Sequence, residues 1–162
     1  MNQVEKAEHL QRLHVPGKPL VLFNIWDAGG ARALQEIGAQ AIATGSWSVA
    51  AAHGYADGEA IPLDLVEMIA TRICATTTLP VSIDFEGGYA AEPEALANNA
   101  ERILDAGAVG VNFEDQVVNG QGLYPVTIQT ARIAALRSSA SARNLPLFIN
   151  ARTDLFLQAA AR

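Results

Sequence analysis

Short apolar stretches alternate along this chain with longer stretches in which apolar residues recur at helical spacing. None of the short stretches alternates polar with apolar residues, a pattern that is typical of parallel strands covered by helices on both faces. Five strands are therefore predicted, at 20–25, 41–44, 80–83, 109–113 and 145–149.

The longer stretches predict helices behind a polar, amphipathic leading helix. Pro62 and Pro93 would occupy first turns of two of them, where a missing N–H does no harm. Gly38 and Gly107 fall where a helix ends and the chain turns into a strand. The four helices expected between the strands lie at 30–37, 62–76, 92–105 and 126–142.

Alternating strands and helices with short loops indicate an α/β protein with parallel strands. The segments 33–44 and 102–113 support this, since each repeats a helix end, a Gly-Ala turn and an apolar strand. No G-x-G-x-x-G motif follows the first strand, which favours a closed barrel over an open doubly wound sheet. A (β/α)₈ TIM-type barrel needs eight strand–helix units. We therefore expect residues 1–162 to hold about the first five units of one truncated barrel domain, with open sheet edges that invite association.

Composition narrows the class of protein. Of the 162 residues, 50% are hydrophobic and 17% are charged, as in ordinary globular proteins. The net charge of −6 argues against nucleic acid and anionic membranes as partners. No apolar run has the length of a membrane span, and the amino terminus resembles neither a signal nor a transit peptide, so a cytoplasmic location is expected. The lone Cys74 is expected to be a buried small side chain in a reducing compartment.

Polar residues follow almost every predicted strand. In parallel α/β proteins ligands bind at the carboxyl ends of the strands, so these residues should share one rim. Carboxylates packed together repel one another unless a cation compensates, and oxygen ligands without a His or Cys cluster suit Mg²⁺ or Mn²⁺. The pair Asp84 and Glu86, ahead of two glycines, is the central candidate. The other strand-end residues are Asn24, Trp26, Asp27, Gly45, Ser46, Trp47, Ser48, His53, Asp57, Glu114, Asp115, Asn150, Arg152 and Asp154.

Several of these residues also have a purely structural interpretation. Asp27 and Asp154 would each serve as a helix N-cap, and Asp57 sits in an ordinary D-G-E turn. Arg152 would either pair with Asp154 or hold a substrate carboxylate with its bidentate fork. Trp26 and Trp47 are expected in the core, unless they wall the pocket. His9, His14 and His53 are expected to be surface or loop residues without a catalytic role.

Five motifs together resemble the isocitrate lyase/phosphoenolpyruvate mutase superfamily, above all its short bacterial members. The resemblance runs from the first strand to the end of the chain, in order and with suitable spacing. The motifs are N-I-W-D-A-G-G-A-R (24–32), T-G-S-W-S-V-A (44–50) with Y-A-D-G (55–58), S-I-D-F-E-G-G-Y (82–89), N-F-E-D-Q (112–116) and N-A-R-T-D (150–154).

The resemblance implies a (β/α)₈ barrel that assembles into dimers or tetramers, often with its last helix exchanged between subunits. It implies Mg²⁺ (or Mn²⁺) with Asp84 as the main ligand, and Asp57, Glu86 and Glu114 acting largely through water. Glu86 stands where the family more often has Asp, so its longer arm should shift a water. Arg152 would bind a substrate carboxylate and join Glu114 as a catalytic residue. The backbone of Gly45, Ser46 and Trp47 would cradle a carboxylate or enolate oxygen.

The segment 114–125 departs from the better-known members of the family. Isocitrate and methylisocitrate lyases carry K-[KR]-C-G-H here, whereas this chain has no Cys, Lys or His in the segment, and only Asn119 resembles the gating loop of phosphonopyruvate enzymes. Decarboxylation of a small 2-oxo dicarboxylic acid through a pyruvate enolate needs an electron sink but no strong base. The expected function is therefore a carbon–carbon lyase or decarboxylase. A carbon–phosphorus hydrolase or mutase, a non-catalytic barrel fragment and a phosphate-binding barrel of another superfamily remain alternatives.

Overall fold

The five strands form one parallel sheet in the order β1-β2-β3-β4-β5. The structure is a computed structural model that describes residues 1–118 and 120–160. Each strand lies beside its predecessor, as in a (β/α)₈ barrel, whereas a doubly wound sheet reverses its order. The predicted α/β class with barrel topology is thereby confirmed. The strands are β1 Asn24–Ile25, β2 Ile42–Thr44, β3 Val81–Asp84, β4 Gly110–Glu114 and β5 Phe148–Arg152.

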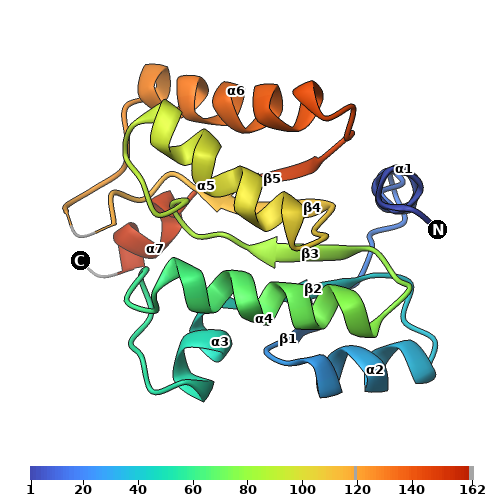
Figure 1. The fold of residues 1–162 in the computed structure, drawn as a ribbon. Coiled ribbons are helices and arrows are strands. Elements are labelled where there is room, and N and C mark those ends of the chain that lie inside the picture. The colour runs from blue at the N-terminus through green and yellow to red at the C-terminus, as the bar shows by residue number, and fades with distance from the viewer. Residues whose placement is uncertain (119, 161–162) are drawn as a thin grey trace.

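The helices lie either along the sheet or at its two ends (Figure 1). α2, α4, α5 and α6 run alongside the strands, α1 lies beside one end of the sheet, and α3 and α7 lie at the end toward which β3 points. None of the helices in the described part of the chain combines the length and the apolar character that crossing a membrane requires. The helices are α1 Gln3–Leu13, α2 Ala28–Glu36, α3 Ser46–Ala52, α4 Leu63–Thr76, α5 Pro93–Asp105, α6 Val126–Ala142 and α7 Leu155–Ala160.

The fifth strand begins three residues later than the sequence predicts. Leu145 closes the turn after α6, because its N–H donates to Ala140 O, and Pro146 has no N–H to give to the ladder. Pairing starts at Phe148, whose N–H donates to Val109 O at 3.0 Å. As a result Asn150 and Arg152 lie within β5 and not after it, which is a correction to the predicted strand end.

Two further predictions at the first two strands are wrong. The first strand is confined to Asn24–Ile25, which pair with Ala43 and Thr44 of β2, and residues 20–23 lie outside it. Val21 and Phe23 are accordingly 69% and 59% exposed. After β2 the chain enters the short helix α3, where only a loop was expected.

The helix ends agree with the predicted turns. Gly38 and Gly107 both have positive φ, and the residue after each donates back five residues into its helix. Asn144 performs the same turn after α6 with φ 54°. These left-handed turns return each helix to the sheet. The core then forms between helices and strands, with Ile83, Phe85, Ile103, Leu104 and Phe113 nearly inaccessible.

Candidate functional site

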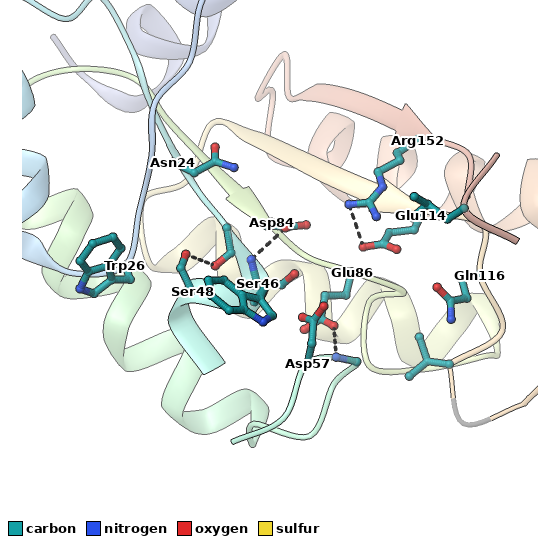
Figure 2. A pocket seen from close by; sticks show the side chains of 15 residues that line it. Asn24, Trp26, Ser46, Ser48, Asp57, Asp84, Glu86, Glu114, Gln116 and Arg152 are labelled. Carbon is teal, nitrogen blue, oxygen red and sulfur yellow. Dashed lines mark hydrogen bonds and ion pairs between the residues drawn. The ribbon is translucent and has the colours of Figure 1, made fainter. Parts of the chain in front are cut away.

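A cavity of about 780 Å³ opens at the carboxyl ends of the strands. Its lining brings together the predicted site residues Gly45, Ser46, Trp47, Asp57, Asp84, Glu86, Glu114 and Arg152. Figure 2 shows the side chains that line this hollow, with Asp84 at the end of β3, Glu86 two residues after it, and Glu114 and Arg152 at the ends of β4 and β5. Asn119, the remaining predicted residue, lies outside the described residues. The predicted rim of strand ends therefore exists as one site.

Asp84 is the last residue of β3 and is held from three sides. Its Oδ2 accepts from the backbone N–H of Ser46 at 2.9 Å, and its Oδ1 accepts from Asn112 Nδ2 at 3.0 Å. Its own backbone N–H donates to Thr44 Oγ1 at 2.9 Å. The Ser46 N–H, which we expected to face a substrate oxygen, is thus bonded to the carboxylate of Asp84.

Glu86 is 4% exposed and occupies a left-handed backbone conformation, φ 50°. Its Oε2 accepts from the backbone N–H groups of Gly58 and Glu59 at 3.0 and 2.8 Å, and its Oε1 accepts from Tyr89 OH at 3.3 Å. These contacts tie the loop after β3 to the turn that carries Asp57. Strained backbone of this kind is common at functional sites.

Burial raises the pKa of Glu86 to about 7, opposed by the N–H group of Glu59 and helped by the nearby carboxylates of Asp57, Glu59 and Asp84. Burial also raises the pKa of Glu114 to about 8, helped by the neighbouring carboxyl group of Asp154. Carboxyl groups whose pKa lies this high need a cation or a proton at neutral pH.

Arg152 lies between two carboxyl groups, that of Glu114 at the end of β4 and that of Asp154 just after β5. Its Nε donates to Asp154 Oδ1 at 2.8 Å, while its Nη1 lies 3.4 Å from Glu114 Oε1. The ion pair with Glu114 favours the ionised carboxylate, yet the raised pKa of Glu114 means that burial and Asp154 outweigh it. The shorter contact makes Asp154 the main partner of the guanidinium. Asp154 Oδ2, which is buried, has no hydrogen-bond partner among the described residues.

Of the structural roles predicted for these polar and aromatic residues, some are confirmed and others are wrong. Asp27 is the N-cap of α2 and accepts from Gly30 N at 2.6 Å, as predicted. Asp154 is wrong as an N-cap, because its 1% exposed side chain bonds to Arg152 instead. Trp26 and Trp47 are not core residues: they are 49% and 70% exposed and line the cavity. His14 is exposed and stacks on Phe148, with ring centroids 3.9 Å apart.

Two residues that sequence reasoning missed support the loop after β3. Arg132 of α6 is 1% exposed, and its Nη2 donates to Gly87 O and to Ala90 O. Glu59 Oε1 accepts from the backbone N–H of Tyr89 at 2.8 Å. A sequence signal for Arg132 did exist, since it shares a three- and four-residue spacing with the buried positions of α6.

The residues around the cavity fit a hard divalent cation. Among the described lining residues, the side chains that could coordinate a metal ion offer carboxylate, amide or hydroxyl oxygens, and none of them is His or Cys. Within residues 1–118 and 120–160, no three His, Cys, Asp or Glu side chains converge closely enough to hold a metal ion by themselves. A cation here would complete its shell with water and substrate oxygens, as Mg²⁺ usually does.

Comparison with curated proteins finds relatives that include lyases and uncharacterised proteins. It is 30% identical over 158 residues to the 2-methylisocitrate lyase of Escherichia coli K12, which covers 88% of this chain and 53% of that enzyme. It is 33% identical over 144 residues to an uncharacterised protein of Mycobacterium tuberculosis, covering 89% of this chain and 52% of that protein. The chain therefore spans about half the length of these curated relatives.

Solved structures agree with the fold. A protein of Burkholderia cenocepacia J2315 with a provisional assignment as a phosphonomutase superposes with a TM-score of 0.93 at 44% identity, over 97% of this chain and 62% of that one. A 2,3-dimethylmalate lyase superposes with a TM-score of 0.80 at 25% identity, over 92% of this chain and 52% of that one. The family model described as phosphoenolpyruvate phosphomutase matches residues 10–162. The chain belongs to this family, and through it to the isocitrate lyase/phosphoenolpyruvate mutase superfamily.

Proposed function

We propose that the protein is a Mg²⁺-dependent (or Mn²⁺-dependent) lyase that breaks a carbon–carbon bond in a small 2-oxo dicarboxylic acid such as oxaloacetate, by decarboxylation through a pyruvate enolate. The observation that carries the proposal is the cavity in which Asp57, Asp84, Glu86 and Glu114 meet Arg152. The cavity holds several carboxylates, which need a cation, beside a guanidinium that can bind a substrate carboxylate. Relatives named 2-methylisocitrate lyase and 2,3-dimethylmalate lyase support carbon–carbon cleavage.

In this proposal Asp84 is the direct ligand, and the other three carboxylates hold water around the cation. A bound Mg²⁺ supplies Lewis-acid stabilisation of the negative charge that develops on the substrate's carbonyl oxygen. Ser46 N and Asn112 Nδ2 keep the Asp84 carboxylate fixed. The loop of Gly58 and Glu59 fixes Glu86 in the same way.

Arg152 receives a carboxylate of the substrate. Asp154 binds its Nε and anchors the side chain, and within the described residues Nη2 has no hydrogen-bond partner. That terminal nitrogen can donate to a substrate carboxylate. Glu114 orients Arg152 from the other side, 3.4 Å from Nη1. The segment 114–125 has no Cys, Lys or His to serve as a strong base, and decarboxylation requires none.

A carbon–phosphorus hydrolase or mutase is the second candidate, favoured by the 44% identical relative with the provisional phosphonomutase assignment. Asn119 would take part in that reaction as the counterpart of a gating-loop residue. A non-catalytic barrel that binds a cation and a carboxylate is the third.

The test measures pyruvate release from oxaloacetate and phosphate release from phosphonopyruvate, each with Mg²⁺ and with EDTA. Asp84→Asn, which keeps the shape of the side chain and removes its charge, should reduce Mg²⁺-dependent pyruvate release to the solution background. Phosphate release alone would replace the proposal by the hydrolase form of the second candidate. If the parent gives neither product but Mg²⁺ and oxalate raise its melting temperature, and Asp84→Asn abolishes that rise, the third candidate holds.

A further inference from the structure

A row of hydrogen-bonded polar side chains crosses three strands and ends on Asp84. The strand register pairs Asp84 with Asn112, and Asn112 with Asn150. Asn150 Nδ2 donates to Asn112 Oδ1 at 2.6 Å, and Asn112 Nδ2 donates to Asp84 Oδ1 at 3.0 Å. All three residues line a second cavity, of about 390 Å³, on the same face of the sheet. We call Asn150 and Asn112 the amide row.

The chemistry of the carboxylate fixes the direction of the amide row. An ionised Asp84 can only accept, so Asn112 must turn its NH₂ group toward it. The side-chain oxygen Oδ1 of Asn112 then faces Asn150, which must donate to it through its own NH₂ group. Both amide dipoles therefore point their positive ends at Asp84, and such aligned bonds polarise and strengthen one another.

The amide row leaves room for a ligand on Asp84. Oδ1 accepts from Asn112 and Oδ2 accepts from Ser46 N, one hydrogen bond for each oxygen. Since a carboxylate offers about four lone-pair positions, roughly two remain for a cation. Hydrogen bonds to a metal-binding carboxylate orient it, and their loss typically weakens metal binding by about 10- to 100-fold.

We propose that Asn112 and Asn150 are positioning residues that set the affinity of Asp84 for its divalent cation. Asn112 acts by direct contact, and Asn150 acts through Asn112. The inference rests on the proposed function, because it takes Asp84 as the direct ligand. Neither amide serves mainly to hold the sheet together, since backbone pairing already joins β3, β4 and β5 and Asn150 is exposed.

The experiment measures Mn²⁺ binding by the electron paramagnetic resonance signal of free Mn²⁺. The proteins compared are the parent, Asn112→Leu, Asn150→Leu and the double variant. Asn112→Leu should bind about 10-fold more weakly, and Asn150→Leu should show a smaller loss. The double variant should match Asn112→Leu, because Asn150 has no effect once Asn112 cannot relay it. The melting temperature in EDTA should change little in each variant.

Ser82→Ala is the matched control. Ser82 lies two residues before Asp84 on β3 and lines the same second cavity, but it does not belong to the amide row. The affinity of the Ser82→Ala variant for Mn²⁺ should equal that of the parent. Circular dichroism checks folding, and Asn112→Ala with Asn150→Ala replace any leucine variant that fails to fold.

The outcomes separate this inference from the proposed function. A parent that binds no Mn²⁺ overturns both. A parent whose binding is lost in Asp84→Asn but unchanged in the asparagine variants overturns the amide row alone. Losses that add in the double variant overturn the relay from Asn150 through Asn112.

Discussion

At the scale of single residues, Glu86 shows how the site is kept under electrostatic stress. Its carboxylate is 4% exposed and faces other carboxylates, and among the described residues two backbone N–H groups and a tyrosine hydroxyl compensate. Burial, the larger cause, and the carboxylates of Asp57, Glu59 and Asp84 hold its pKa near 7. The folded chain therefore keeps a proton on Glu86 that the unfolded chain releases at lower pH.

This difference predicts a pH dependence of stability in the metal-free protein. Because the folded pKa lies above the ordinary 4.5, the contribution of Glu86 is fully present below pH 4.5 and is lost as the pH rises through about 7. The loss is on the order of 3 kcal/mol. Glu86→Gln should flatten the decline of the melting temperature between about pH 5 and 8, measured in EDTA. Glu36→Gln, at a side chain that is 70% exposed, is the control. An unchanged slope in Glu86→Gln would contradict the raised pKa.

Gly88 shows a second kind of residue-scale constraint. The structure gives Gly88, the second glycine after Glu86, a packing role. It has φ +80°, and a Cβ there would lie 2.1 Å from Leu96 Cδ1. Gly122 has nearly the same φ, +79°, with no atom within 4 Å of such a Cβ. The two positions therefore separate backbone strain from steric overlap.

We predict that Gly122→Ala costs about 1 kcal/mol of unfolding free energy, the strain of an L-residue with positive φ. Gly88→Ala should cost roughly 1–3 kcal/mol more, because Leu96 and its neighbours must move. Urea denaturation of both variants measures the difference. Equal losses would mean that the core around Leu96 absorbs the methyl group freely.

At the scale of elements, α6 positions the loop that carries Glu86. Arg132 reaches from the helix to Gly87 O and Ala90 O, and its guanidinium lies 4.0 Å from the centroid of the Tyr124 ring. Burial lowers the pKa of Arg132, although Tyr124 and Glu59 oppose the shift. A buried cation bonded to two carbonyl groups acts as a clamp on the loop after β3.

Arg132→Met should lower the free energy of unfolding by about 2–4 kcal/mol, because both carbonyl groups lose a buried donor. Arg143→Met, at the C-cap of the same helix, removes an exposed ion pair with Asp105 and should cost less than about 1 kcal/mol. Chemical denaturation gives both values. Equal effects in the two variants would show that the clamp contributes no more than a surface pair.

The elements also show what the sequence could and could not reveal. Apolar runs located the carboxyl ends of β3 and β4, so Asp84 and Glu114 were found before the structure was known. Pro146 delays the start of β5, so that Asn150 lies within the strand opposite Asn112, and this could not be deduced from apolarity alone. The role of Arg132 depends on which helix packs over the loop after β3. Such tertiary contacts lie outside what local patterns encode.

At the scale of the whole molecule, α7 lies at the end of the sheet that carries the site (Figure 1), and it exposes adjacent apolar side chains. Leu155, Phe156 and Leu157 are 55%, 76% and 61% exposed. These three residues are neighbours in sequence, and together they leave apolar surface exposed on α7. Contiguous apolar surface of this kind is typical of interfaces. We expect α7 to contact another subunit, in agreement with the predicted dimer or tetramer.

This expectation is tested by the oligomeric state in solution. Sedimentation velocity of the parent should give a dimer or a tetramer, and Phe156→Ser should shift the distribution toward smaller species at the same concentration. Ile37→Ser is the matched control, because Ile37 is 79% exposed at the end of α2, without exposed apolar neighbours in sequence. Its distribution should match that of the parent. A parent that sediments as a monomer, or a Phe156→Ser variant that assembles like the parent, would exclude α7 as the contact. Because Leu157 also lines the cavity beside Trp47 and Arg152, an interface on α7 would connect assembly to the shape of the site.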